Sequence, residues 1–364
     1  MEAICASGVP VLAVDIPSGI HTDTGEVLDA AAKARATVTF ACAKPGLLFD
    51  PGKRYAGEVL VRDIGIGFDA GEEETPWYGS VEKEDLDRFL TRTPMGNKGT
   101  FGKVLVLAGS GAMCGAAVLC ARAVLASGAG MVKVVTEERN RTPLFCALPE
   151  AMADFWKEDE PLPEEALLQD LAWADAVVAG PGLSKSRTAK ELLVFTVQHT
   201  EVPLVLDADA LNLIAEDAEI LSGCRAEKIL TPHVGELARL LHMTIAECQR
   251  DPAESAGRAA EKYQACCVRK DSVTVTAEEG REQYYINTSG SSALATAGSG
   301  DVLAGITGAF AAKRQCEKNE KKISLAKTAA LAAYAHGKAG EAAEEKSSAS
   351  YVTASEIIRG LQSI

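Results

Sequence analysis

Several features that would define a class of protein are missing from this 364-residue sequence. None of its ten cysteines forms a Cys-x-x-Cys pair and its five histidines are far apart, so the ligand spacing of a zinc site is absent. No apolar run is long enough to span a bilayer, and the first residues lack the basic start and apolar core of a signal peptide. A net charge of -14 argues against nucleic-acid and anionic-membrane partners. We therefore expect a cytoplasmic protein with neither partner.

The composition indicates a soluble globular chain, with 47% hydrophobic and 24% charged residues. Two blocks can be distinguished along it. The first runs from about residue 9 to residue 67 and holds the strand-like stretches "VPVLAVDI" and "ATVTFA". Residues 68–93 then bring an acidic run, a proline and a short amphipathic helix candidate, which is typical of a linker. The second block covers about residues 80–364.

The second block alternates short apolar runs with helical stretches, such as the small-residue helix "CGAAVLCARAVLASGAG", expected to end at Gly128 or Gly130. This alternation predicts βαβ units around a largely parallel sheet that is buried on both faces. The expected strands are 103–109, 130–136, 175–182, 203–210, 228–233 and 272–277, the last as a half-buried edge strand.

Glycines and polar residues follow the apolar runs of this block. They are Gly109, Gly111, Gly180, Gly182, Asp207, Asp209 and His233 to Glu236. Each could be ordinary turn punctuation. Ligands of parallel sheets bind beyond the carboxyl ends of the strands, however, so the shared position favours one common site.

The stretch "TAGSGDVLAG" (296–305) places two glycines around a serine directly before Asp301 and an apolar helix start. A glycine turn that opens into a helix leaves unpaired backbone N–H groups at the positive end of the helix dipole, which favours anion binding. Asp301 could cap the helix, or it could be a base beside a bound phosphate. These residues alone leave both interpretations open.

Other polar residues have equally open roles. Asp207 and Asp209 are expected on the same side of a strand end, where they could hold magnesium or a sugar, or one could cap a helix starting near Leu211. His233 could contact a ligand or be a satisfied loop residue, and Glu236 gains from the helix dipole either way. Lys270 could be solvated or could reach a phosphate.

Eight stretches of the second block occur in the order typical of the NAD(P)H-hydrate dehydratase family, which the sequence resembles over nearly all of residues 80–364. They are "KGTFGKVLVLAGS", "GAAVLCARAVLASGAGMVKV", "LPEAM", "AGPGL", "VLDADALN", "LTPHVGELARL", "ATAGSGDVLAGI" and "AYAHGKAGEAA". The resemblance implies a ribokinase-like three-layer α/β/α domain with a mainly parallel sheet. It also implies a lyase that restores hydrated NADH and NADPH by phosphorylating the ring hydroxyl and eliminating phosphate.

The same resemblance implies roles for individual residues. Asp301 would be the catalytic base. The phosphate and nucleotide would contact Lys270, Thr296, Gly298, Ser299 and Gly300, and the hydrated dinucleotide would contact Gly111, Gly182, His233, Glu236 and Asn212. ADP or ATP would be the phosphoryl donor with Mg²⁺, and ADP is favoured. Asn97 and the pair Gly290-Ser291 depart from the usual family pattern, and the second departure is expected to weaken nucleotide affinity.

The first block resembles the second half of an NAD(P)H-hydrate epimerase domain, a partial Rossmann-like α/β segment, through "VLAVDIPSGIHTDTGE", "ATVTFACAKPGLL" and "GEVLVRDIGIG". The resemblance places a vestigial potassium site at Asp15 and Ser18. The expected N-terminal half of that domain is missing before Met1, so we expect an exposed sheet edge and no epimerase activity. The expected domains are the epimerase half at 1–70 and the dehydratase at 91–364. Residues 71–90 are expected to form a linker and the helix that enters the dehydratase domain.

Two other functions stay open at this point. A vitamin-precursor kinase of the same fold class would use the same Gly-Ser-Gly-Asp motif and release a stable phosphate ester. A non-catalytic nucleotide-binding module is the second alternative, although the intact Asp301 and its glycines argue against it. Met1 could also be a misplaced start of a longer bifunctional protein. Family members often form oligomers, so a homo-oligomer is possible.

Overall fold

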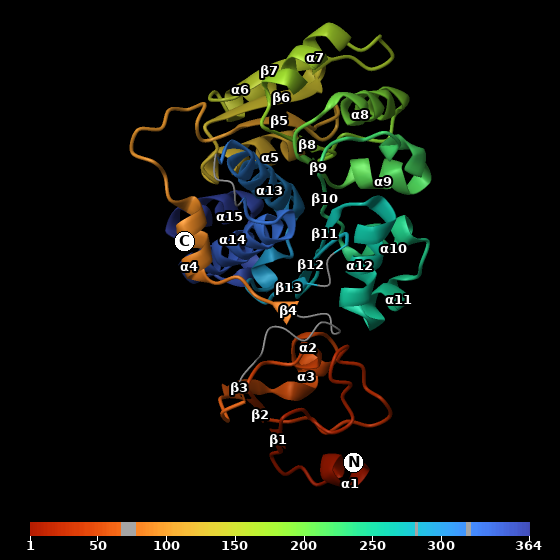
Figure 1. The fold of residues 1–364 in the computed structure, drawn as a ribbon, viewed down its shortest axis with the longest axis vertical. Helices are drawn as coiled ribbons and strands as arrows, with labels where there is room; N and C mark the ends of the chain where they lie inside the picture. Colours follow the sequence, from red (N-terminus) through yellow and green to blue (C-terminus); the bar gives the residue numbers. More distant parts are fainter. Residues whose placement is uncertain (67–77, 281–282, 318–321) are drawn as a thin grey trace.

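The computed structural model describes residues 1–66, 78–280, 283–317 and 322–364, which form a small N-terminal body and a large α/β body (Figure 1). The large body contains a ten-stranded sheet with the strand order β4-β13-β12-β11-β10-β9-β8-β5-β6-β7. Its strands are β4 (Tyr78–Gly79), β5 (Lys103–Leu107), β6 (Met131–Glu137), β7 (Met152–Trp156), β8 (Ala176–Ala179), β9 (Leu204–Leu206), β10 (Lys228–Leu230), β11 (Cys266–Arg269), β12 (Thr274–Glu278) and β13 (Tyr284–Asn287).

The sheet is mainly parallel, as predicted. All neighbouring pairs from β11 to β7 are parallel, and only β12 is antiparallel to the strands on both of its sides. The central strands read as continuous apolar runs because helices cover both faces: every residue of β8, β9 and β10 is buried.

Two helix layers enclose the sheet (Figure 1). One contains α5 (Cys114–Ala126), α13 (Ser299–Cys316), α14 (Leu325–Lys346) and α15 (Ala354–Gly360), whose many alanines and glycines allow close helix contacts. The other side carries α7 (Glu164–Trp173), α8 (Arg187–His199), α9 (Asp209–Glu216), α10 (Val234–Leu241), α11 (Ile245–Arg250) and α12 (Pro252–Tyr263). Helix α6 (Arg141–Ala147) follows β6. The arrangement confirms the predicted three-layer α/β/α class.

The structure also corrects parts of the strand prediction. The stretch 272–277 is not an edge strand: β12 lies between β11 and β13, and its three central residues are buried. Sequence reasoning missed β7, β11 and β13, because two of them are four-residue strands and β7 has no continuous aliphatic run. The helix expected to end at Gly128 or Gly130 ends at Ala126, and Gly128 follows with a φ of +96°.

The small body has a three-stranded parallel sheet in the order β1-β2-β3, formed by β1 (Leu12–Val14), β2 (Ala36–Phe40) and β3 (Glu58–Arg62). Short helices accompany it: α1 (Glu2–Ala6), α2 (Pro45–Leu48) and α3 (Gly52–Ala56). The outer strand β1 leaves its Leu12 and Val14 side chains about two-thirds exposed, at 64% and 65%. Within the described chain β1 pairs only with β2, so the expected exposed sheet edge is present at β1.

The predicted linker falls partly outside the described residues, which omit 67–77. The helix expected after it is α4 (Lys83–Leu90), and its Leu86 and Phe89 are buried in the core of the large body. Strand β4 also pairs with β13, so the large body already begins at Tyr78. Within the described ranges, no helix combines the length and apolar character needed to cross a membrane.

Candidate active site

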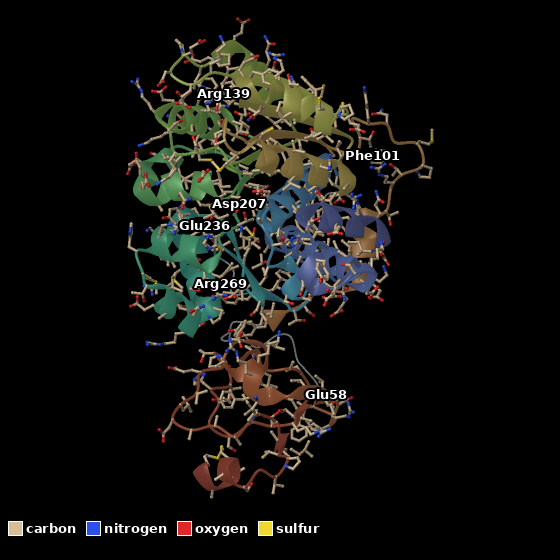
Figure 2. All side chains as sticks on the ribbon, turned by 180° about the vertical axis from the view of Figure 1, so that it is seen from behind. Glu58, Phe101, Arg139, Asp207, Glu236 and Arg269 are labelled. Carbon is tan, nitrogen blue, oxygen red and sulfur yellow. The ribbon has the colours of Figure 1, made fainter. Side chains whose placement is uncertain are left out.

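The site lies where five adjacent parallel strands end. The loops after β11, β10, β9, β8 and β5 carry, in that spatial order, Lys270, His233, Asp207, Gly182 and Gly111. Backbone bonds join neighbouring loops: the Lys270 N–H donates to the Pro232 carbonyl over 2.8 Å. Figure 2 shows Asp207 and Glu236 in the middle of the large body, with Arg139 toward the end that is remote from the small body. The glycines and polar residues predicted to share one site therefore do follow the carboxyl ends of neighbouring strands.

The Gly-Ser-Gly-Asp turn begins α13. Gly298 is the N-cap with a φ of +87°, a left-handed conformation that favours glycine, and the helix starts at Ser299. Its first-turn N–H groups have no intrahelical acceptor, and within the described chain no other acceptor is bonded to those of Gly300 and Asp301. The Ser299 hydroxyl lies 3.1 Å from His336 Nε2. Asp301 is not the cap, so the capping interpretation is wrong.

The Asp301 carboxyl is largely buried and lies close to the charged side chains of Asp207 and Lys270. Burial, together with the negative charge of Asp207, raises the pKa of its carboxyl to about 7, against the opposing effect of Lys270. No hydrogen bond engages this carboxylate among the described residues. A carboxyl of this kind can exchange a proton near neutral pH, which is what a general base requires.

Lys270 is the buried cation of the site. Its ammonium donates to Asp207 Oδ1 over 2.7 Å, and the Asp207 side chain is only 2% exposed. Burial alone would lower the pKa of Lys270, but the carboxylates of Asp207 and Glu236 raise it above its usual value. A β-carbon placed on Gly300 would lie 3.5 Å from the Lys270 Nζ, so this ammonium stands directly beside the glycine turn. Lys270 is therefore not the solvated surface lysine that its place in the sequence allowed.

His233 and Glu236 form the capping box of α10. His233 Nδ1 accepts from the Gly235 N–H at 3.0 Å, and Glu236 Oε2 accepts from the His233 N–H at 2.9 Å. Burial and the charge of Lys270 lower the pKa of His233, so the imidazole is neutral at physiological pH. Burial raises the pKa of Glu236. Both residues thus start the helix and also lie close to the charges of Lys270 and Asp207.

A pocket of about 660 Å³ adjoins the glycine turn. It brings together the predicted residues Lys270, Thr296, Ser299, Gly300 and His233. Sequence reasoning missed much of its wall, and these further residues include Asn287, Ser289, Leu294, His336 and Gly337. The quoted stretch "AYAHGKAGEAA" contained His336, whose pKa is lowered to about 4 by burial and by Lys270, but only the fold shows that it faces Ser299.

Gly111 and Gly182 lie in the loops that follow β5 and β8. The Ser110 N–H donates to the Gly182 carbonyl over 2.6 Å, so the two loops are joined. The Gly111 N–H donates to the Glu137 carboxylate, which also pairs with Arg139. These glycines do not line the 660 Å³ pocket, so any role in binding the dinucleotide would be outside that pocket.

Asp207 and Asp209 do not share one face as expected. Strand β9 ends at Leu206, and Ala208 has a φ of +50°, which turns the chain between the two acids. Asp207 meets Lys270, whereas Asp209 opens α9 and accepts from the Ser184 N–H at 2.8 Å. Asn212 lies beside Asp209 and accepts from Arg239 at 3.1 Å, away from the pocket of Lys270. Asn212 therefore does not line the pocket of Lys270, and it could influence this pocket only through its contact with Asp209.

In the small body, Asp15 does not offer a free cation site. Its Oδ1 accepts from the Lys44 ammonium and from the Thr39 hydroxyl at 3.1 Å. The bond from Lys44 lowers the pKa of Asp15, despite some desolvation. The Lys44 ammonium therefore already compensates the charge at this oxygen, and the potassium site at Asp15 and Ser18 stays a prediction.

Comparisons with known proteins agree with the geometry. Residues 104–363 match the family described as NAD(P)H-hydrate dehydratase, and residues 1–46 match the family described as YjeF-related protein N-terminus. A bifunctional NAD(P)H-hydrate repair enzyme from Moorella thermoacetica is 37% identical over 349 residues, covering 91% of this chain and 62% of its own length. The chain therefore spans less than two thirds of that relative.

Solved structures give the same result. A ribokinase-like superfamily protein from Enterococcus faecalis superposes with a TM-score of 0.65 at 28% identity, covering 79% of this chain and 94% of the other. The ADP/ATP-dependent NAD(P)H-hydrate dehydratase from Bacillus subtilis, co-crystallised with ATP and Mg²⁺, gives 0.64 at 30% identity, covering 77% and 95%.

Proposed function

The chain belongs to the NAD(P)H-hydrate dehydratase family, and from this premise we propose that it restores the (S)-hydrates of NADH and NADPH at the expense of ADP or ATP. ADP is the donor favoured by the resemblance described above. Since the chain spans 62% of the relative from Moorella thermoacetica, the bifunctional activity of such relatives is carried over only as a proposal.

The proposed reaction has two steps. The ring hydroxyl attacks the terminal phosphorus of the nucleotide; the new O–P bond forms as the bond to the bridging oxygen breaks, and the hydroxyl proton passes to Asp301. In the second step the ring C–O bond breaks and phosphate leaves with its electron pair. The neighbouring carbon loses a proton, and the double bond of the dihydronicotinamide is restored.

The observation that carries this proposal is the position of Asp301 in the first turn of α13, next to Gly298 to Gly300 and near Lys270. The pKa of about 7 lets this carboxyl accept a proton at neutral pH. The free N–H groups of the helix start face the developing charge of the transferring phosphoryl group, whose transition state depends mostly on positioning and electrostatics.

The neighbouring residues then have distinct proposed tasks. Lys270, held by Asp207, brings a positive charge to the glycine turn. Thr296, Ser299, Gly300 and the neutral His233 line the pocket for the nucleotide, and Glu236 accepts from the His233 N–H. Gly111 and Gly182, in the loops after β5 and β8, are assigned to the hydrated dinucleotide because the family resemblance implies it.

The carboxylates fit a magnesium ion that arrives with the nucleotide. Asp207 keeps its Oδ2 directed toward Gly300, and oxygen donors are what Mg²⁺ prefers. No group of three or more metal-ligating side chains is found among the described residues, so the phosphates would supply most of the ligands. When bound, the ion neutralises charge on the phosphate oxygens.

For the small body we propose that residues 1–66 do not epimerise the hydrates. The support is the Lys44 ammonium at Asp15, which keeps this carboxylate paired and ionised, and the lowered pKa of Asp15 that follows from it. The ten cysteines are all free, which supports the proposed reducing, cytoplasmic location. A homo-oligomer remains a prediction.

The direct test is the return of the near-ultraviolet absorbance of dihydronicotinamide when hydrated NADH is mixed with ADP or ATP and Mg²⁺. Wild type should restore it and release free phosphate. A stable phosphate ester without restored absorbance would instead identify a small-molecule kinase of the same fold, and nucleotide binding without either product would identify a binding module.

A further inference from the structure

The small body contacts the large body through side chains that include Phe49, Leu48 and the Glu26–Arg250 ion pair at 4.0 Å. Phe49, which follows α2, is only 2% exposed and packs into a core cluster of the large body that includes Leu237, Cys267 and Val273. Figure 1 shows α2 and α3 as the elements of the small body nearest the large sheet. Burial of a whole aromatic side chain fixes the position of the neighbouring backbone, so α3 has a defined place beside the large body.

Helix α3 places Lys53 at the wall of the 660 Å³ pocket. Its side chain lines this pocket together with Lys270, Asp271, Ser272 and the glycine turn. The next residue, Arg54, faces a different cavity between the two bodies and bonds to Asp50 at 2.9 Å. Two adjacent basic residues of one short helix therefore line two different cavities.

The charges of the pocket single out Lys53. Lys270 is paired with Asp207 at 2.7 Å, and Asp271 is paired with Arg269 at 3.2 Å. His233 and His336 both have lowered pKa values and are neutral. Lys53 forms no ion pair or side-chain hydrogen bond with any other residue that the structure describes. It is thus a charged wall residue whose charge is not matched by a protein carboxylate.

From this arrangement we propose that Lys53 of the N-terminal body binds the phosphate chain of the nucleotide in the pocket of the dehydratase body. The inference rests on the proposed function for the identity of the pocket's occupant. A nucleoside di- or triphosphate carries several negative charges, and an ammonium attracts them as a point charge. The small body would then contribute to nucleotide affinity without epimerising anything.

The test compares the full chain with Lys53→Met, and measures the dissociation constants of ATP, ADP and adenosine by calorimetry. Lys53→Met should weaken the binding of ATP by about three- to fivefold, the upper range for one exposed charge pair, and leave the binding of adenosine unchanged. Lys53→Arg should keep wild-type affinity, and Lys53→Glu should weaken ATP more than Lys53→Met. The loss should shrink at high salt, because ions screen the attraction.

Arg54→Met is the matched control, since it removes a positive charge from the adjacent position of the same helix but faces the other cavity. It should leave the ATP affinity within about twofold of wild type. Equal weakening of ATP and adenosine by Lys53→Met, an effect of Arg54→Met as large as that of Lys53→Met, or no effect of either would overturn the inference.

The outcome separates this inference from the proposed function. Wild type that binds ATP through Lys53 but restores no hydrated NADH would refute the dehydratase proposal alone. Restoration of hydrated NADH with unchanged ATP affinity in Lys53→Met would refute the role of Lys53 alone. Wild type that binds no nucleotide would refute both.

Discussion

The two bodies of this chain place an aspartate in opposite electrostatic settings. In the large body, Asp301 is held by a helix start beneath a sheet covered on both faces, and burial raises the pKa of its carboxyl to about 7. In the small body, Asp15 follows a strand whose side chains are largely exposed, and the bond from Lys44 lowers its pKa. One carboxyl is ready to take a proton near neutral pH, and the other stays ionised.

The comparison shows what a covered sheet provides. Burial on both faces removes water from the loops after the strands, so charges such as Asp207 and Lys270 act on Asp301 with little screening. A three-stranded sheet with exposed Leu12 and Val14 cannot exclude water in this way. The same residue type therefore has a raised pKa in one body and an ion pair in the other.

The largest expected effect is on the Asp301 side of the comparison. Asp301→Asn should lower the rate of hydrate repair by about 10²- to 10⁴-fold, because the amide cannot accept the hydroxyl proton. The rate is measured by the return of dihydronicotinamide absorbance, with nucleotide affinity measured in parallel and expected to persist. Asp87→Asn, at an exposed surface pair, is the control and should leave the rate unchanged. A variant at Asp301 that keeps a tenth or more of the rate would remove it from the role of base.

Breaking the buried ion pair should follow in size. Lys270→Met leaves Asp207 buried without its partner, which costs about 3–5 kcal/mol of unfolding free energy, measured by denaturant titration. The double variant Lys270→Met with Asp207→Asn removes both charges and should recover part of that loss. Lys44→Met in the small body is the comparison, since the Asp15 carboxylate is 42% exposed and water can solvate it. Similar losses for the two lysines would contradict the difference drawn between the bodies.

The contact between the bodies comes next. Phe49→Ala should cost about 2 kcal/mol of docking free energy, the value of burying an aromatic side chain at this contact. Limited proteolysis should then cut residues 1–66 faster, while the unfolding midpoint of the large body stays near that of wild type. Leu12→Ala, which changes an exposed side chain, should leave the cleavage rate as in wild type. Equal protection in Phe49→Ala and wild type would show that other contacts hold the small body.

The smallest effects should appear in the pH dependence. Repair activity should rise with pH and level off above about 7, as Asp301 loses its proton, and this is measured as a pH-rate profile. Stability should respond in the opposite sense, because the folded carboxyl binds a proton that the unfolded one has released. The contribution of Asp301 to stability therefore falls as the pH rises from 3.8, the ordinary pKa of an aspartate, toward about 7.

Asp15 supplies the contrast for that experiment. Its lowered pKa contributes stability above 3.8, and this contribution is lost as pH falls through the folded value. Asp301→Asn should remove the decline in unfolding free energy between about pH 4 and pH 7. The loss of stability at acidic pH that comes from Asp15 should remain. An unchanged decline in that variant would show that another group causes it.

Sequence patterns predicted the parts of the fold that depend on local composition. Continuous apolar runs identified β5, β6, β8, β9 and β10, because strands covered on both faces have no polar side to alternate with. The pattern was misleading at β12, where alternating Val and Thr suggested an edge, because the covering strand β13 and its pairing partner β4 are too short to signal themselves.

By itself, the sequence determined the family, the α/β class and the identity of the residues that gather at the strand ends, since motif order and hydrophobic runs are local properties. Only the tertiary structure decided how those residues meet. The positive φ of Ala208 separates Asp207 from Asp209, the pairing of β11 beside β10 brings Lys270 to Asp207 across 63 positions, and Phe49 carries Lys53 to a pocket of the other body. Such encounters depend on the packing of distant elements, and no local pattern in the chain encodes them.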